Sequence, residues 1–193
     1  KAEEIVGQAI AGRRDEVVIA TKCGLVWHTD KGNHFFDELG KRVHRHLGRD
    51  SIRHELEQSL RRLKTDYIDL YITHWQDPTT PVAETMSTLL DLKKEGKIRA
   101  IGVSNVSPEE LKAYVAEGQV DAIQERYSML DREIESSLLP LCRQHDIACL
   151  SYSSLALGLL SGKIGPNRVF EGDDLRKGNP RFAPDNLKRV AAF

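Results

Sequence analysis

Polar residues that can take part in catalysis or ligand binding stand at the ends of five short apolar runs. A lysine supplies a positive charge, a histidine exchanges a proton near pH 7, and amide and tyrosine side chains hold or stack on planar ligands. Taken singly, each residue type more often serves the surface, a turn or the core. One polar group at the end of every run is the joint pattern that indicates a site. The residues are Lys22, His74, Asn105, Gln124 and Tyr152.

The five runs have the composition of buried strands. Each is short and rich in β-branched or aromatic residues, which is typical of parallel strands covered on both faces. The carboxyl ends of parallel strands share one edge of a sheet, so we expect the five polar residues to open on the same rim. We predict strands at residues 17–21, 67–73, 98–103, 121–125 and 147–152.

Amphipathic helical patterns fill the gaps between the predicted strands. Three of them follow the first, second and third strands, and a fourth helix is expected over residues 136–145. Pro140 predicts a late start or a kink in that helix, because a proline inside a helix removes a hydrogen bond. The expected helix starts are Asp50 or Ser51, Thr80 followed by Pro81, and a capping box from Ser107 to Glu110.

Repeated strand–helix units imply a parallel sheet with right-handed crossovers. An eight-stranded barrel and an open doubly wound sheet both fit this alternation. No G-x-G-x-x-G follows the first strand, which weakens the open dinucleotide-binding sheet. Residues 24–49 and 154–186 are expected to be long loops after strands, where sites are commonly built.

Two features of the first loop have both a functional and a structural interpretation. Trp27 either lines a substrate pocket or packs against its neighbours, and the sequence gives these equal weight. His44 and His46 form an H-x-H pair, but no third ligand at a suitable spacing accompanies them. We therefore favour a solvated loop and expect no metal.

Composition narrows the class of protein. The 193 residues carry a formal net charge of −1 and are 40% hydrophobic, which suits one substantial core. The balanced charge gives no indication of nucleic-acid or anionic-membrane partners, and no apolar run approaches the roughly 20 residues of a membrane span. The three scattered cysteines favour a reducing compartment, so we expect a cytoplasmic protein.

Three long motifs resemble the aldo-keto reductase family, within it the bacterial branch of general-stress and inositol-utilisation reductases. Asp66 to Tyr71 with His74-Trp75 resembles the family's fourth-strand motif, and Gly96 to Asn105 its fifth-strand motif. Tyr152 to Lys163 is similar to the segment after the seventh strand, with Ser154 in place of the usual proline. The similarity covers nearly the whole chain.

The resemblance implies a (β/α)8 TIM barrel that reduces aldehydes or ketones to alcohols with NADP(H). Lys22 and His74 match two members of the family's catalytic Asp, Tyr, Lys and His tetrad, and the partner is a small carbonyl substrate. The residues that match cofactor-binding positions are Ser104, Asn105, Gln124, Tyr152, Ser153, Leu155, Gly158 and Lys163. The departure at Ser154 predicts a looser entry to the loop that covers the pyrophosphate.

The resemblance also implies that residues 1–193 form a single barrel domain that lacks its N-terminal and C-terminal portions. The family's Asp and Tyr lie before the segment that starts here at Glu3, and its eighth strand would follow Phe193, so about five of eight strands are expected. Three interpretations stay open: a carbonyl reductase, a non-catalytic nicotinamide-binding regulatory subunit, and an inactive fragment of the same family. The motifs match bacterial enzymes, which favours the reductase.

Overall fold

The protein is described by a computed structural model that covers residues 1–190, so residues 191–193 lie outside the description. The chain forms two compact units. The first comprises Lys1–Glu125 and Ile134–Leu150, and the second comprises Arg126–Glu133 and the chain from Ser151 onward. No helix within residues 1–190 has the length and apolar composition that a membrane crossing requires.

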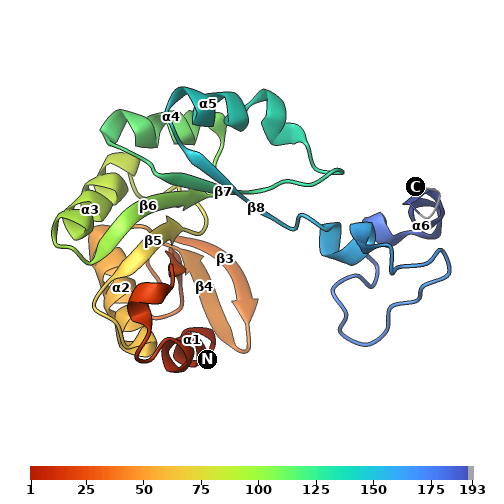
Figure 1. Ribbon diagram of the computed structural model, residues 1–193, viewed down its shortest axis with the longest axis horizontal. Coiled ribbons are helices and arrows are strands. Elements are labelled where there is room, and N and C mark those ends of the chain that lie inside the picture. The colour runs from red at the N-terminus through yellow and green to blue at the C-terminus, as the bar shows by residue number, and fades with distance from the viewer. Residues whose placement is uncertain (191–193) are drawn as a thin grey trace. The chain divides into compact units, whose positions relative to one another are not determined.

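A five-stranded sheet, in the order β1-β5-β6-β7-β8, organises the first unit (Figure 1). Neighbouring strands pair in parallel from β1 to β5, from β5 to β6 and from β6 to β7, which confirms the predicted parallel sheet. The strands are β1 (Ala20–Cys23), β5 (Ile68–Thr73), β6 (Ile98–Ser104), β7 (Ala122–Arg126) and β8 (Ala148–Tyr152).

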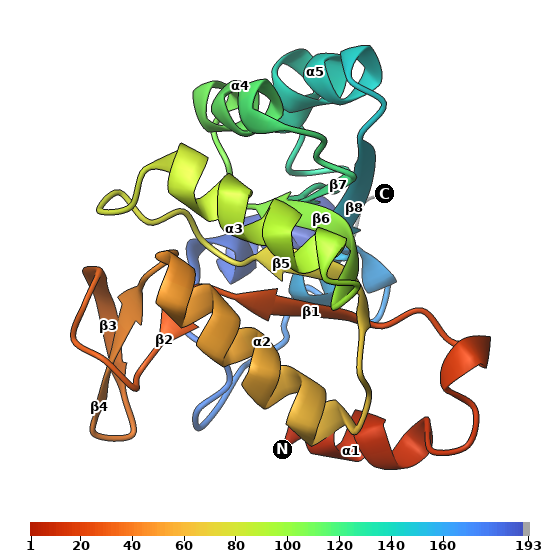
Figure 2. The ribbon, with the colours of Figure 1, turned by 90° about the vertical axis from the view of Figure 1, so that its left-hand side faces the viewer.

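Helices cover one side of this sheet (Figures 1 and 2). The helices that follow β1, β5, β6 and β7 are α2 (Arg49–Leu63), α3 (Val82–Lys94), α4 (Pro108–Glu117) and α5 (Leu138–Gln144). Leu56, Leu89 and Ile101 are among the fully buried side chains between sheet and helices. Helix α1 (Ala2–Ala9) packs on α2 at Gly7, where an added Cβ would lie 2.6 Å from a carbonyl oxygen of α2.

Helix starts agree only in part with the predicted caps. The Ser107–Glu110 capping box is present, and α5 begins at Leu138, so that Pro140 falls in its first turn as expected. Asp50 and Ser51 lie inside α2, which starts from Gly48, so the predicted cap was wrong. Thr80 does not cap α3 either, because its hydroxyl donates to Asp77 instead.

The first strand lies later in the chain than predicted. Strand β1 starts at Ala20, and Val18 is 82% exposed. The reason is a distant carboxylate: the Asp69 side chain accepts from the Ile19 N–H at 2.9 Å, so the ladder begins only after this residue. Lys22, expected to follow the strand, lies within it.

The expected loop 24–49 contains a small antiparallel sheet, which corrects the prediction (Figure 2). Its order is β2-β4-β3, and its strands are β2 (Leu25–Val26), β3 (Asn33–Glu38) and β4 (Lys41–Arg45). A two-residue turn at Leu39-Gly40 joins β3 to β4, with positive φ at both residues, as in a type I′ hairpin.

The second unit has little regular structure. It contains the 3-10 turns η3 (Ala156–Ser161) and η4 (Pro180–Phe182) and the short helix α6 (Pro184–Val190), whereas a long loop was expected over 154–186. Its core consists of Ala156, Leu159, Phe182 and Leu187. Two more 3-10 turns, η1 (Arg14–Glu16) and η2 (Glu133–Ser136), lie elsewhere in the chain.

Candidate active site

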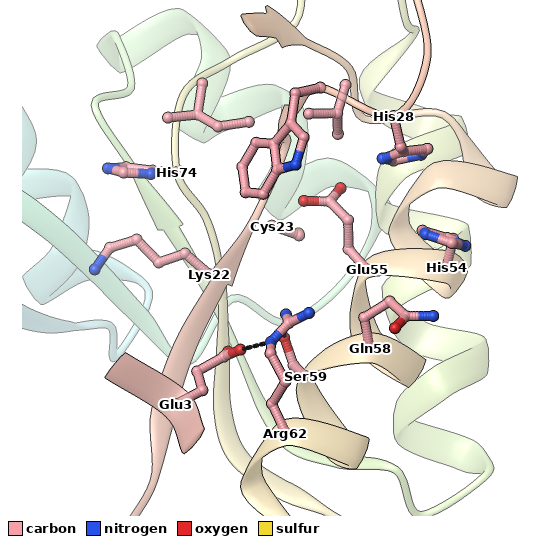
Figure 3. A pocket seen from close by; sticks show the side chains of 13 residues that line it. Glu3, Lys22, Cys23, His28, His54, Glu55, Gln58, Ser59, Arg62 and His74 are labelled. Atoms are coloured by element: carbon pink, nitrogen blue, oxygen red, sulfur yellow. Dashed lines mark hydrogen bonds and ion pairs between the residues drawn. The ribbon is translucent and has the colours of Figure 1, made fainter. Parts of the chain in front are cut away.

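A cavity of about 630 Å3 in the first unit brings the two predicted catalytic residues together (Figure 3). Lys22 and His74 both line it, although 51 residues separate them in the sequence, since parallel strands β1 and β5 are neighbours. The full lining is Glu3, Lys22, Cys23, Leu25, Val26, Trp27, His28, His54, Glu55, Gln58, Ser59, Arg62 and His74.

Lys22 carries a positive charge that no carboxylate of the described residues balances. Its backbone pairs with Ile72 of β5, and its side chain leaves β1 on the side opposite Cys23 (Figure 3). Within residues 1–190 the ammonium group makes no ion pair. Burial lowers the pKa of Lys22, because removing the ammonium from water disfavours its charged form.

Both backbone polar groups of His74 are hydrogen-bonded. Its N–H donates to the Cys23 carbonyl at 2.8 Å, and its carbonyl accepts from the Asn105 side-chain amide at 2.8 Å. Burial lowers the pKa of His74, and the nearby Lys22 charge lowers it further. The imidazole is therefore neutral at pH 7 and carries one N–H donor and one acceptor nitrogen.

Three of the predicted cofactor residues follow on the next two strands. The Ser104 hydroxyl donates to the Gln124 carbonyl at 2.6 Å and accepts from Asn105 at 3.1 Å. Asn105 adopts φ of 55°, a left-handed conformation that asparagine tolerates better than most residues. Ser104 is only 1% exposed, so in this structure it supports Asn105 and joins β6 to β7.

A buried amide that the sequence did not single out completes this network. Gln76 donates to the Ser104 carbonyl at 2.9 Å and to the Thr73 hydroxyl at 3.2 Å. Its own oxygen accepts from the Tyr114 hydroxyl at 2.7 Å. Gln76 thus joins the ends of β5 and β6 to α4, and only its position next to the His74-Trp75 motif could have suggested it.

The cavity also contains charged residues that sequence reasoning missed. Glu3 of α1 accepts from Thr21 and from Arg62, both at 2.6 Å (Figure 3). Burial raises the pKa of Glu3, but these bonds outweigh it and the net pKa is lowered. Glu55 of α2 faces Cys23, and burial raises its pKa to about 8. A sequence shows no link between such residues, because they meet only after α1, β1 and α2 pack together.

The remaining predicted cofactor residues lie on one segment of the second unit. Tyr152 is the last residue of β8, Ser153 follows it with positive φ, and Leu155 and Lys163 are exposed. Gly158 has φ of 91° and joins the two turns of η3. The Ser151 and Ser154 hydroxyls lie 3.0 Å apart, so a hydrogen bond holds this stretch where the usual proline is missing. The cofactor-binding roles of Tyr152, Ser153, Leu155, Gly158 and Lys163 stay predictions.

The structure modifies the interpretation of three residues in segment 24–49, which follows β1. Trp27 lines the cavity yet is 61% exposed, so it serves as a wall and is not core packing. The solvated-loop prediction for the H-x-H pair was wrong: His44 is buried in β4, and His46 lies 3.3 Å from the Asp77 carboxylate. Among the described residues, no cluster of three or more His, Cys, Asp or Glu side chains could hold a metal ion.

Comparison with known proteins places this geometry in a family. The "NADH-specific methylglyoxal reductase" of Escherichia coli (strain K12) is 45% identical over 194 residues, which cover 98% of this chain and 58% of that protein. The "Aldo-keto reductase YhdN" of Bacillus subtilis (strain 168) is 45% identical over 190 residues, which cover 97% of this chain and 54% of that protein. The chain thus spans a little over half the length of these curated relatives.

Solved structures support the same assignment. The glycerol dehydrogenase AKR11B4 from Gluconobacter oxydans is 39% identical and superposes with a TM-score of 0.89, over 98% of this chain and 56% of that chain. The α/β fold with its parallel sheet therefore matches the TIM barrels of aldo-keto reductases over part of their length. A family model described as "Aldo/keto reductase family" matches residues 1–193. The chain belongs to the aldo/keto reductase family.

Proposed function

We propose that the native protein is a cytoplasmic NADP(H)-dependent oxidoreductase that reduces aldehydes or ketones to alcohols, with Lys22 and His74 as catalytic residues. The observation that carries the proposal is a partly buried ammonium that shares a cavity with a histidine. Such a charge costs stability in a purely structural role. A perturbed lysine and histidine that share a cavity are typical of a catalytic site.

The residues near the strand ends fit a nicotinamide carboxamide. Within residues 1–190 the side-chain amide of Gln124 makes no hydrogen bond, so its donor and acceptor are available to a ligand. Asn105 lies at the end of the neighbouring strand, and the resemblance to the family assigns it a second contact to the carboxamide. The segment from Tyr152 to Lys163 would hold the remainder of the cofactor, with Tyr152 stacking on the nicotinamide.

NADP(H), when bound, supplies the hydride that reaches the carbonyl carbon of the substrate. The neutral His74 donates its N–H to the carbonyl oxygen and orients it. The Lys22 ammonium stabilises the negative charge that develops on the oxygen and on the tyrosine that the resemblance implies as proton donor. Trp27 and the apolar residues of β2 restrict access of water to the same space.

The test compares two lysine-to-methionine variants of the native full-length polypeptide. Lys22→Met keeps much of the volume but removes the charge, whereas Lys112→Met changes an exposed lysine on α4. We expect Lys22→Met to lower kcat by roughly 10²-fold or more, the usual scale of proton-transfer assistance, with the Kd for NADPH changed less than about threefold. Near-normal turnover in Lys22→Met would remove Lys22 from the catalytic residues.

Nicotinamide binding is tested separately by fluorescence titration with NADPH and NADH. Gln124→Ala should weaken binding by roughly 2- to 10-fold, the effect of one lost hydrogen bond. Gln119→Ala, before the N-terminal end of β7, should leave it unchanged. Tight binding without hydride transfer to any aldehyde would favour the non-catalytic subunit, and tighter binding of NADH than NADPH would overturn the cofactor preference.

A further inference from the structure

Glu55 is a titratable residue of the cavity that the proposed reaction does not use. It projects from α2 toward Cys23, on the side of β1 opposite Lys22 (Figure 3). A carboxyl group in the layer between a helix and a strand is costly unless it has a specific partner. The hydrogen-bond partners of Glu55 indicate its role.

Its closest partner is the backbone N–H of Gly24, two residues after Lys22, and the Ser51 hydroxyl also donates to Glu55 at 3.5 Å. Both carboxyl oxygens of Glu55 lie near the Gly24 N–H, at 3.1 and 3.0 Å. The carbonyl of Gly24 accepts from the His46 N–H at 3.1 Å, so both of its backbone polar groups are bonded. Gly24 has φ of 95°, a conformation that residues with a Cβ rarely adopt, so this turn favours glycine.

This contact lies just past the carboxyl end of the ladder between β1 and β5. The last ladder position is Cys23, directly before the turn. Glu55 therefore bonds the backbone from the helix side, one residue beyond the point where ladder bonding stops.

We propose that Glu55 is a positioning residue for Lys22: by bonding the Gly24 amide it fixes the end of β1 on α2 and so sets where the Lys22 ammonium stands in the cavity. The catalytic meaning of this proposal rests on the proposed function, but the positioning itself does not. Three titratable groups interact electrostatically with Glu55: the side chains of Cys23 and Tyr71 in the sheet and Arg62 on α2.

Burial raises the pKa of Glu55 to about 8, so the side chain is largely an uncharged acid at pH 7. An uncharged carboxyl group still accepts a hydrogen bond through its carbonyl oxygen. Glutamine presents the same oxygen at the same distance from the backbone. A glutamine at this position should therefore preserve the contact, whereas leucine, of similar volume, should abolish it.

The experiment measures Gly24 amide exchange and the pKa of the Lys22 ammonium by NMR in four variants. In Glu55→Leu we expect Gly24 exchange to rise roughly 10- to 100-fold, as for an amide left without its partner. The pKa of Lys22 should move upward toward its ordinary value, because a loosened strand end exposes the ammonium. Glu55→Gln should stay within about twofold of the wild type in exchange rate.

Two further variants keep the proposal falsifiable. Glu57→Leu removes a carboxylate from the same helix that pairs with Lys97, and it should change neither readout. If Glu55→Leu does not fold, Glu55→Asp, whose shorter side chain withdraws from Gly24, should raise exchange in the same direction. An unchanged Lys22 pKa in a folded Glu55→Leu or Glu55→Asp protein overturns the proposal. These readouts need no cofactor, so this failure is distinct from normal turnover in Lys22→Met.

Discussion

In the first unit, many side chains between the sheet and its helices are fully buried, and the side chains of Thr73, Gln76, Ser104 and Asn105 near the strand ends take part in one hydrogen-bonded network. The second unit surrounds a core of four buried residues. Its backbone takes positive φ at Ser153, Ala156, Leu157 and several glycines. Apolar burial organises the first unit, whereas the second depends on a few specific contacts.

One carboxylate dominates those contacts. Asp131 is 1% exposed and accepts from both terminal nitrogens of Arg181, which ties η4 to the loop after β7. Ser128 donates to the same carboxylate at 3.0 Å, and Arg126 lies 3.3 Å from it. A long loop can thus be ordered by a small apolar core together with one buried carboxylate, and neither produces a periodic pattern in the sequence.

The largest effect is expected from a cavity in the first unit. Leu89→Ala deletes a side chain that is fully buried between α3 and the sheet. We expect a loss of about 2–5 kcal/mol in the free energy of unfolding, from lost burial and the remaining void. Urea denaturation checks this. A loss below about 1 kcal/mol would mean that apolar packing does not dominate the first unit.

A smaller and local effect is expected from the second unit. Asp131→Asn keeps the shape of the side chain but removes its charge, and we expect about 1–3 kcal/mol less stability in residues 151–190. We favour the lower end of this energy range because the Arg181 side chain is one-third exposed and water therefore reaches it. Hydrogen exchange of residues 151–190 measures the change.

Asp174→Asn is the matched control for this variant. It breaks a pair with Arg176, only two residues away, and should leave exchange in the second unit unchanged. Equal effects of the two substitutions would contradict the special role of Asp131. A loss of stability spread evenly over both units would contradict the claim that different contacts stabilise the two units.

The smallest effect is expected at a helix start of the first unit. Ser107→Ala removes the side chain that accepts from the Glu110 N–H at 3.1 Å, and we expect a loss of about 1 kcal/mol. Thermal unfolding measures it. Exchange in residues 151–190 should not respond, and a response there would show that the two units are not independently stabilised.

The sequence predicted what depends on local periodicity and local capping. The parallel strands, the Ser107–Glu110 box and the late start at Pro140 all follow from residues near one another in the chain. The first strand was misplaced because its start depends on Asp69, fifty residues away. The predicted caps at residues 50 and 80 were wrong because Gly48 is the N-cap of α2, and because the Thr80 hydroxyl donates to Asp77.

The β3–β4 hairpin in segment 24–49 was not predicted, for a different reason. Residues of β3 are mostly exposed, so burial leaves no alternating pattern, and leucine is an unusual residue for the positive φ of a type I′ turn. The shared cavity of Lys22 and His74 could be anticipated because each lies at or near the carboxyl end of a predicted strand, and His74 also lies in one of the three motifs. Glu55 and Gln76 could not, because their partners come from other elements of the fold.

The central claim is that the Lys22 charge lies beside a neutral His74, and the pKa of His74 measures it most directly. Burial and Lys22 both lower this pKa below its ordinary value near 6.5. An NMR titration of His74 should therefore give a midpoint below 6.5 in the wild type and a higher midpoint in Lys22→Met, because removing a nearby positive charge favours protonation. A wild-type midpoint at or above 6.5, unchanged in Lys22→Met, would contradict the account.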